Sequence, residues 1–256
     1  GDETLLTFKN RYYGPVFEML LYRITRDMAD PQRFFMRHFL IFSLFVIGLF
    51  FFYLLGKRIT KNWAAGLLGC VLIIASPRIF AHSFFNSKDI PFMAVFIIAI
   101  FTLIRYLDRR TALNAVMHAL TTAVLIGLRA PGVLVFVLTV ALLPLDILID
   151  NKTTRINPAL LTGLLYVGLT AILVILFWPI LWHDPYHEFI NALKQMSQYP
   201  WPGVVLYRGL MVDPNNLPWH YIPVWVLITT PLQYLVLAGC GFLSAGWDIL
   251  ANFGKN

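Results

Sequence analysis

Long apolar runs separated by short polar segments dominate the chain. Seven runs approach the length that a helix needs to cross about 30 Å of hydrocarbon, at about 1.5 Å per residue. They lie near residues 38–56, 63–80, 90–107, 112–129, 132–149, 157–182 and 220–244. The Pro131-Gly132 pair beside Arg129 divides what would otherwise be one very long helix. The pattern predicts an all-α integral membrane protein with about seven transmembrane helices.

The same pattern predicts a single polytopic domain over residues 1–256. We expect an outer loop with interfacial helices over 1–37, six spans over 38–182, a second outer loop over 183–219 and the seventh span over 220–244. The chain opens on Gly1-Asp2-Glu3 without an initiator methionine. We therefore expect a piece of a longer protein.

Composition agrees with a membrane protein. Hydrophobic residues make up 59% of the chain and charged residues 13%, with a mean hydropathy of +0.71, whereas soluble domains carry about 25% charged residues. The net charge of +7 does not indicate nucleic-acid binding, because the basic residues are scattered at the ends of apolar runs, where they orient helices. Cys70 and Cys240 lie inside apolar runs and are interpreted as packing residues, with no disulfide framework or zinc site indicated.

Basic residues in the connecting segments predict the orientation. If the runs alternate, the clusters at 57–61, 105–110 and 152–155 fall on one side, which the positive-inside rule makes cytoplasmic. The opposite side then receives residues 1–37, 78–89, 129–131 and 183–219. Six basic residues of the first segment lie there against the rule, and we interpret them as a functional or headgroup-binding surface.

The first segment has the pattern of a helix that lies in the membrane interface. One helical face gathers the apolar residues Phe17, Leu20, Leu21 and Ile24. Glu18, Arg23 and Arg26 lie elsewhere on the helix, which gives an amphipathic pattern. Gly14-Pro15 is expected to begin this helix, and a second short piece is expected from Pro31 to Arg37.

A second polar segment lies between two apolar runs. Between Ser76 and Pro91 it brings together Arg78, His82, Asn86, Lys88 and Asp89. Ionisable groups near the bilayer cost several kcal/mol each unless they are paired or wetted, so the segment is a candidate functional loop. The alternatives are a solvated loop, a helix cap formed by Ser87 or Asp89, and a buried, hydrogen-bonded His82.

Other polar residues near the runs have open interpretations. His183 and His187 are four residues apart, which presents two imidazoles to a metal ion if the backbone is helical, although a lone His pair more often caps or hydrogen-bonds. Arg129 is expected to pair with an outer acid or with a lipid phosphate. His118, in the middle of a run, is expected to hydrogen-bond a neighbouring helix.

Three segments together resemble a known class of enzymes. They are Pro77-Arg-Ile-Phe-Ala-His-Ser-Phe-Phe-Asn-Ser-Lys-Asp-Ile-Pro91, Trp178-Pro followed by Trp182-His-Asp-Pro185, and Leu217-Pro-Trp-His-Tyr-Ile-Pro-Val-Trp225. With the polar first loop, they resemble the GT-C class of membrane glycosyltransferases. The closest resemblance is to the bacterial members related to protein O-mannosyltransferases and aminoarabinose transferases, glycosyltransferase family 39.

The resemblance implies a glycosyltransferase that takes a sugar from a polyprenyl phosphate at the outer face of a bacterial inner membrane, with the site facing the periplasm. In such enzymes an acidic residue soon after the first span acts in catalysis. Asp2 and Glu3 occupy the matching place here, with Glu18 as a rival, if the first span lies upstream of residue 1. Further spans or an outer domain are then expected beyond Asn256. The implied partners are the lipid-linked donor, membrane lipids and an acceptor of unknown identity, without nucleic acid.

The residue types suit this chemistry. A carboxylate such as Asp2 or Glu3 takes the proton from the acceptor hydroxyl. Cations stabilise the departing phosphate, with Arg78 and Lys88 best placed and Arg208 more distant. Asp89 is a third catalytic candidate, and its candidate roles are to orient Lys88, to bind a sugar hydroxyl or to join a divalent metal site. A divalent metal ion is the one cofactor that the sequence leaves open. The remaining candidates for the substrate pocket are His82, Asn86, Glu18, Trp219, His220 and Tyr221.

Two other function classes remain open. A small-solute transporter would place ionisable residues deep within several spans, whereas the spans over 38–56 and 90–104 contain no acidic or basic residue beyond His38. A noncatalytic lipid-binding subunit of a larger complex would have the same fold but lack the catalytic carboxylate base. Separate substitution of Asp2, Glu3 and Asp89 distinguishes this subunit from an enzyme.

Overall fold

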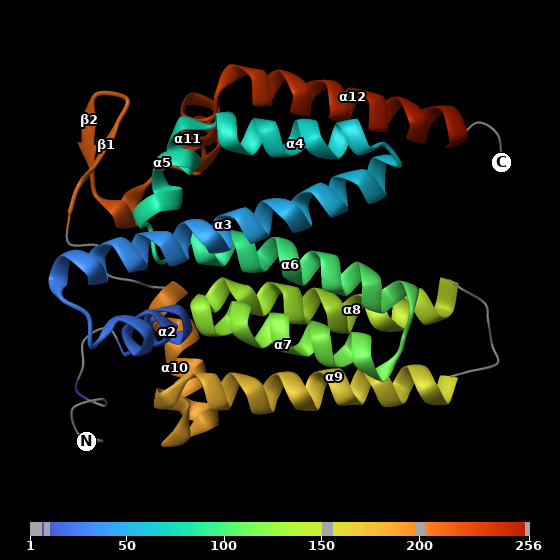
Figure 1. Cartoon of the computed structure of the whole chain (residues 1–256). Helices are drawn as coiled ribbons and strands as arrows, with labels where there is room; N and C mark the ends of the chain where they lie inside the picture. The colour runs from blue at the N-terminus through green and yellow to red at the C-terminus, as the bar shows by residue number, and fades with distance from the viewer. Residues whose placement is uncertain (1–6, 8–10, 150–155, 198–202, 254–256) are drawn as a thin grey trace. The chain divides into compact units, whose positions relative to one another are not determined.

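A computed structural model shows a largely helical chain and describes residues 7, 11–149, 156–197 and 203–253 (Figure 1). The chain forms two compact units, Gly1–Gln198 and Tyr199–Asn256. Asp2 and Glu3 lie outside the described residues. The expected all-α membrane fold is confirmed in its main feature, since long apolar helices make up most of the described chain.

The first unit consists of helices joined by short links. Its α-helices are α2 (Val16–Thr25), α3 (Asp30–Thr60), α4 (Trp63–Ala75), α5 (Pro77–Phe85), α6 (Asp89–Asp108), α7 (Ala112–Leu128), α8 (Val133–Ile149), α9 (Ile156–Phe177) and α10 (Pro185–Ser197). Two short 3₁₀ helices, η1 (Ala130–Gly132) and η2 (Pro179–Trp182), connect α7 to α8 and α9 to α10. α3 packs on α4 and α6, and α7 packs on α6 and α9.

The prediction of seven transmembrane helices was wrong. Among the described residues, four helices are long and apolar enough to cross a membrane, and their apolar stretches are Asp30–Thr60, Asp89–Asp108, Ala159–Phe177 and Leu232–Ala251. A fifth span results if α4 and α5, which are bent by 75°, count as one. α7 has only 17 residues, and the apolar stretch that follows it, Ala130–Leu145, is also short.

Prolines explain two of the interruptions. Pro77 begins α5 directly after Ser76, whose backbone is extended, so the segment expected to be a polar loop is mostly a short helix. Pro231 follows Thr230, which is also extended, and separates α11 from α12 within the expected seventh span. Proline lacks the N–H that continues a helix and disfavours helical backbone at the residue before it.

Small residues allow α3 to approach its neighbours. A methyl group built on Gly48 would lie 2.8 Å from the β-carbon of Ala94 on α6. One built on Gly56 would lie 2.8 Å from the α-carbon of Gly66 on α4. Close approach through small residues is typical of helices that pack within a membrane.

A buried histidine links three helices at the centre of the unit. His118 on α7 is fully buried; its Nδ1 lies 3.0 Å from the Thr102 hydroxyl on α6 and its Nε2 lies 2.9 Å from the Thr139 hydroxyl on α8. Its ring stacks on Tyr166 of α9 with centroids 4.8 Å apart. The expected hydrogen bond from His118 to a neighbouring helix is confirmed.

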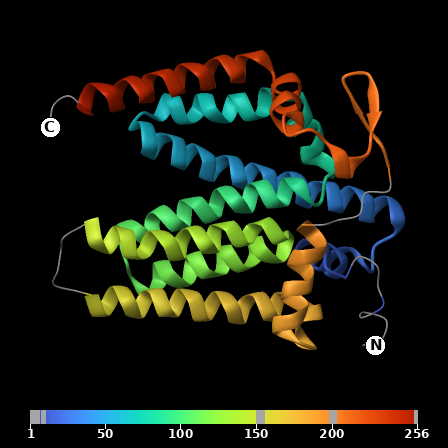
Figure 2. The same cartoon turned by 180° about the vertical axis from the view of Figure 1, so that it is seen from behind.

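One end of this helical unit has an ion pair between basic and acidic helix ends, and the other end is covered by two short helices. Arg58 and Asp108 form an ion pair between the last turns of α3 and α6, so two of the basic clusters predicted to share a side do lie at one end. At the other end, α2 packs on α3 and α7, and α10 packs on η1 and η2 (Figure 2). Tyr12 donates a hydrogen bond of 2.8 Å to Glu188 and so joins the segment before α2 to α10.

The second unit combines a hairpin with two helices. Strands β1 (Val205–Tyr207) and β2 (Leu210–Val212) pair antiparallel. Arg208 and Gly209 form the two-residue turn with positive φ angles of 53° and 84°, which is the backbone of a type I′ turn. The 3₁₀ helix η3 (Pro214–Asn216), α11 (Tyr221–Thr229) and α12 (Leu232–Phe253) follow.

Candidate functional site

The backbone before α2 rests directly on the end of α7. A methyl group built on Gly14 would lie 2.3 Å from the carbonyl oxygen of Gly127, and one built on Gly127 would lie 2.4 Å from Cγ2 of Val16. Neither position has room for a side chain. Phe17 and Leu21 are buried on the inner face of α2, but Leu20 and Ile24, which were predicted to share that apolar face, are 49% and 40% exposed. Together these contacts place the polar residues of α2 over the end of α7.

Glu18 holds α2 to two other elements. One of its carboxylate oxygens accepts a hydrogen bond of 2.7 Å from Arg37 of α3. The other accepts a short hydrogen bond from the hydroxyl of Ser87, between α5 and α6. The Glu18 carboxylate is therefore fixed by partners at both oxygens.

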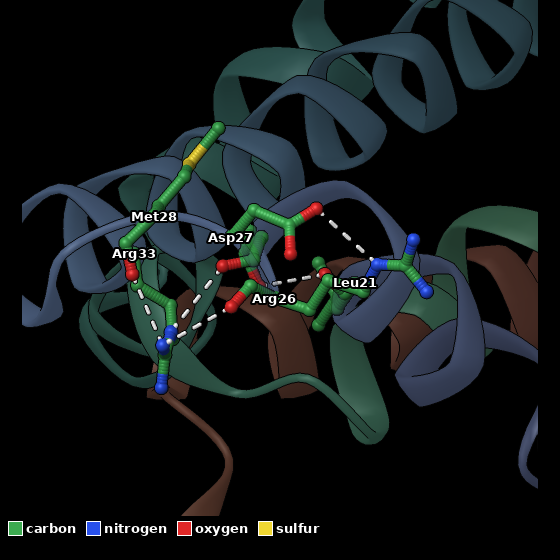
Figure 3. A network of polar contacts seen from close by, with 6 residues as sticks. Leu21, Arg26, Asp27, Met28 and Arg33 are labelled. Atoms are coloured by element: carbon green, nitrogen blue, oxygen red, sulfur yellow. Dashed lines mark hydrogen bonds and ion pairs between the residues drawn. The ribbon is translucent and has the colours of Figure 1, made fainter.

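Arg33 fixes the turn from α2 to α3, which is drawn in Figure 3. Its Nη2 donates to the carbonyl oxygens of Met28 at 3.0 Å and Arg26 at 3.4 Å, and its Nε donates to the carbonyl of Thr25 at 3.3 Å. A cation at these carbonyls satisfies acceptors that the end of a helix leaves open. The orientation of α2 is thus set at both of its ends.

Asn86 organises the link between α5 and α6. Its Oδ1 accepts hydrogen bonds from the backbone N–H groups of Lys88 and Asp89 at 3.0 and 2.8 Å. Its Nδ2 donates to the Asp89 carboxylate at 2.9 Å and lies 2.8 Å from Nδ1 of His82. Asn86 therefore binds two backbone N–H groups at the start of α6. The N-cap position of α6 is occupied by Lys88, and not by Ser87 or Asp89, the alternatives that the sequence left open.

Two cations lie at the ends of α6 and α7. The ammonium of Lys88 lies 4.6 Å from the centroid of the Tyr13 ring, in a cation–π contact. Arg129 lies in extended backbone where α7 ends, and its Nη2 forms an ion pair of 2.8 Å with Asp89. Of the two partners expected for Arg129, an acid or a lipid phosphate, the structure shows an acid, Asp89.

These elements enclose a cavity of about 460 Å³. Its charged lining residues are Arg11, Glu18, Lys88 and Arg129, and most of the remaining lining is apolar. Trp178, at the end of α9, and Pro179 and Ile180 of η2 contribute to the wall. The cavity is large enough for a small headgroup, and its mixed walls suit a ligand with charged and apolar parts.

The predicted site residues fall into several groups. Glu18 and Lys88 line the cavity, and Asp89, Asn86 and His82 are connected to it by hydrogen bonds or the ion pair with Arg129. Arg78 is an exposed residue of α5 and is not part of the lining.

Four further candidates, Arg208, Trp219, His220 and Tyr221, belong to the second unit. The Tyr207 hydroxyl lies 2.6 Å from Nδ1 of His220, so this histidine is held against the hairpin. Trp219 is 88% exposed within the chain. Arg208 occupies the hairpin turn.

The two candidate metal ligands near α10 have separate environments. α10 begins at Pro185, so His183 precedes the helix and does not share a helical turn with His187. Asp184 accepts hydrogen bonds from the His187 backbone N–H at 3.0 Å and from its Nδ1 at 2.7 Å. These bonds, the backbone one first, hold the pKa of the Asp184 carboxyl below its usual range. Within the described parts of the chain, no three His, Cys, Asp or Glu side chains are grouped to hold a metal ion.

Neither Arg37 nor Trp178 was given an individual role at the site from the sequence. Arg37 was one of the six basic residues of the first segment interpreted together as a functional or headgroup-binding surface, and Trp178 belonged to a segment that carries the family resemblance. The signal for Arg129 was a lone charge beside Pro131 between two apolar runs. Trp178 lines the cavity, and Arg37 is connected to it only through Glu18. Both positions depend on tertiary packing, which the spacing of residues in the sequence does not indicate.

The fold is that of an all-α membrane protein, and its candidate site is a charged cavity at one end of the first helical unit. No protein-family model matches the chain, and neither a curated protein nor a solved structure matches it. The cavity and its residues are therefore the features from which a function can be inferred.

Proposed function

We propose that the chain is an inverting glycosyltransferase of the GT-C type that uses a polyprenyl-phosphate-linked sugar. In this proposal it works at the extracytoplasmic face of a bacterial inner membrane. The observation that supports it is the cavity itself, where Glu18, Lys88 and Arg129 meet from different elements beside apolar walls. A lipid-linked donor has the matching composition, with an anionic and polar headgroup on an apolar chain.

The proposed reaction is a single displacement at the sugar. A carboxylate takes the proton of the acceptor hydroxyl while its oxygen attacks the anomeric carbon, and the bond from that carbon to the phosphate oxygen breaks. Polyprenyl phosphate leaves with the electron pair of the broken bond. Lys88 is the cation proposed to stabilise this developing negative charge, because it is one of the residues that line the cavity.

The choice of base follows from the contacts of Glu18. Both of its oxygens already accept hydrogen bonds, from Arg37 and Ser87, so we assign it to holding α2 over the cavity. Asp2 and Glu3 stay the proposed bases, and they lie outside the described residues.

The test is a transfer assay on the chain in lipid nanodiscs. Polyprenyl-phosphate sugars with a radiolabelled sugar are supplied with bacterial membrane extract as the source of acceptor, and labelled product is measured. We expect transfer from at least one donor, and Lys88→Met is expected to lower the rate about a hundredfold. Lys57→Met, at the far end of α3, is the matched control and keeps the wild-type rate. Equal rates for Lys88→Met and wild type would refute the proposed role of the cavity.

A noncatalytic lipid-binding subunit is the second candidate. The full engagement of Glu18 favours it, since no described carboxylate that lines the cavity has a free oxygen. Separate Asp2→Asn and Glu3→Gln variants distinguish the two candidates. Loss of transfer in either variant, with donor binding kept, supports the enzyme; donor binding without transfer in the wild type supports the subunit.

A further inference from the structure

Two buried donors at the cavity lack a partner. Arg129 Nε and Trp178 Nε1 are both buried, and neither has a hydrogen-bond partner among the described residues. Trp178 is only 1% exposed, and both residues line the cavity. An unsatisfied buried donor costs about 1–3 kcal/mol and is rare in native proteins, so two at one cavity indicate a missing acceptor.

The charges around the cavity favour an anion as that acceptor. Arg11, Lys88 and Arg129 contribute three positive charges to the lining, against the single carboxylate of Glu18. Glu18 is in turn paired with Arg37, and Arg129 with Asp89. These two outside partners, one positive and one negative, cancel one another in the charge balance. The described lining therefore keeps an excess of positive charge beside its two open donors.

Asp89 controls the direction of the Arg129 guanidinium. Its carboxylate binds Nη2 at 2.8 Å, while Nε of the same guanidinium is buried. The Asp89 side chain is 58% exposed and that of Arg129 36%, and such exposed pairs contribute little to stability. The pair is therefore better explained by orientation, because one fixed guanidinium nitrogen restricts where the others lie.

From this geometry we infer that Arg129 and Trp178, with Lys88, form a binding site for a phosphate ester, and that Asp89 positions Arg129. Phosphate offers several acceptor oxygens to a guanidinium, an indole N–H and an ammonium together. The apolar remainder of the lining favours a phosphate attached to an apolar chain. The inference rests on the proposed function and identifies where the donor phosphate would be held.

The experiment measures binding without transfer. The chain in nanodiscs of uncharged lipid is titrated with farnesyl phosphate, with farnesol and with inorganic phosphate, and complexes are counted by native mass spectrometry. Arg129→Gln and Trp178→Phe are each expected to weaken farnesyl phosphate binding about tenfold or more, while farnesol binding stays unchanged. Asp89→Asn is expected to weaken it less, and Arg129→Lys, which keeps the charge, is expected to restore part of the affinity lost in Arg129→Gln.

Matched controls separate the site from general effects. Trp182→Phe changes an exposed indole whose N–H already donates to the Ile175 carbonyl, and Arg23→Gln removes an exposed charge of α2. Both are expected to bind farnesyl phosphate as the wild type does. Wild-type affinity for farnesyl phosphate in Arg129→Gln and Trp178→Phe would overturn the inference.

The probes also separate the source of the phosphate and the two proposals. Tighter binding of farnesyl phosphate than of inorganic phosphate supports a lipid headgroup, and equal, Arg129-dependent binding of both supports free phosphate and refutes the lipid. Phosphate binding that depends on Arg129, without transfer of any sugar, leaves this site in place and refutes the enzyme. Sugar transfer, together with farnesyl phosphate binding that does not depend on Arg129 or Trp178, supports the enzyme and refutes this site.

Discussion

Gly14 and Gly127 are in direct backbone contact, with room for a side chain at neither position. Gly14→Ala would push its methyl group to 2.3 Å from the Gly127 carbonyl oxygen, so α2 must shift away from α7. We expect a loss of about 1–3 kcal/mol in the free energy of unfolding, measured by denaturant titration in detergent.

Gly168→Ala is the control for that substitution. A methyl group there meets no atom within 4 Å, and alanine is favoured over glycine inside a helix by about 0.5–1 kcal/mol. We expect it to be neutral or stabilising. Equal destabilisation by both substitutions would contradict the close approach of α2 to α7.

Ser87 and Glu18 are coupled, although 69 positions separate them. Ser87→Ala removes one hydrogen bond to the Glu18 carboxylate and is expected to lower stability by about 1 kcal/mol. The double variant Glu18→Gln/Ser87→Ala is expected to lose less than the sum of the single variants. Additive losses in a double-mutant cycle would show that the two side chains do not interact.

The ion pair of Glu18 and Arg37 is partly exposed, so its contribution to stability is expected to be small and to depend on salt. Their side chains are 42% and 31% exposed, so Arg37→Gln is expected to cost about 0.2–1 kcal/mol. This cost is expected to fall as salt is added, because salt screens exposed charges. Unfolding at low and high salt measures it, and a cost that grows with salt would contradict the assignment.

His118 holds α6, α7 and α8 together through its two ring nitrogens. His118→Leu keeps most of the volume and loses both hydrogen bonds, each worth about 0.6 kcal/mol within a membrane. His118→Ala also leaves a cavity beside Tyr166 and is expected to cost about 2–3 kcal/mol in total. Leu113→Ala, at an exposed position of the same helix, is the control and should cost less than either, as thermal unfolding in detergent would show.

The arrangement of helix ends predicts a labelling pattern. In a chain whose Cys70 and Cys240 are replaced by serine, single cysteines at Lys57 and Arg109 are expected to react with an impermeant maleimide from the same side of the membrane. A cysteine at Asp27 is expected to react from the opposite side, because α3 runs between the two ends. Reaction of all three from one side would contradict a membrane-spanning α3.

The positions of the helices could be predicted from the apolar runs, but the number of spans could not. Every expected run contains helix, because burial of apolar side chains favours it. The count failed where prolines divide a run, at Pro77 and Pro231, and where a helix such as α7 is short. Whether such a helix crosses a membrane depends on its neighbours, which hydropathy does not describe.

The candidate site was predictable only in part. Lys88 and Asp89 attracted notice because charges between apolar runs are costly. The ion pair of Asp89 with Arg129 joins residues 40 positions apart, and the Glu18 contacts join α2 to two later elements. The sequence predicts an acidic partner for Arg129 but not which acid, and it contains no signal for the Glu18 contacts, because these pairings depend on how helices pack. The backbone N–H groups at the start of α6 are bound by Asn86, whereas the sequence left Ser87 and Asp89 as the candidate caps.

The central claim is that the cavity at the end of α7 holds the phosphate end of a polyprenyl phosphate. Its most direct test is photolabelling of the chain in nanodiscs with a prenyl phosphate that has a diazirine on the first isoprene unit, followed by peptide mapping. The account predicts labels concentrated in the segments that contribute lining residues to the cavity, 11–19, 87–88, 128–129 and 178–180, and their loss with excess unlabelled farnesyl phosphate. Labels confined to the lipid-facing surfaces of α4 and α9, and unaffected by that competitor, would contradict it.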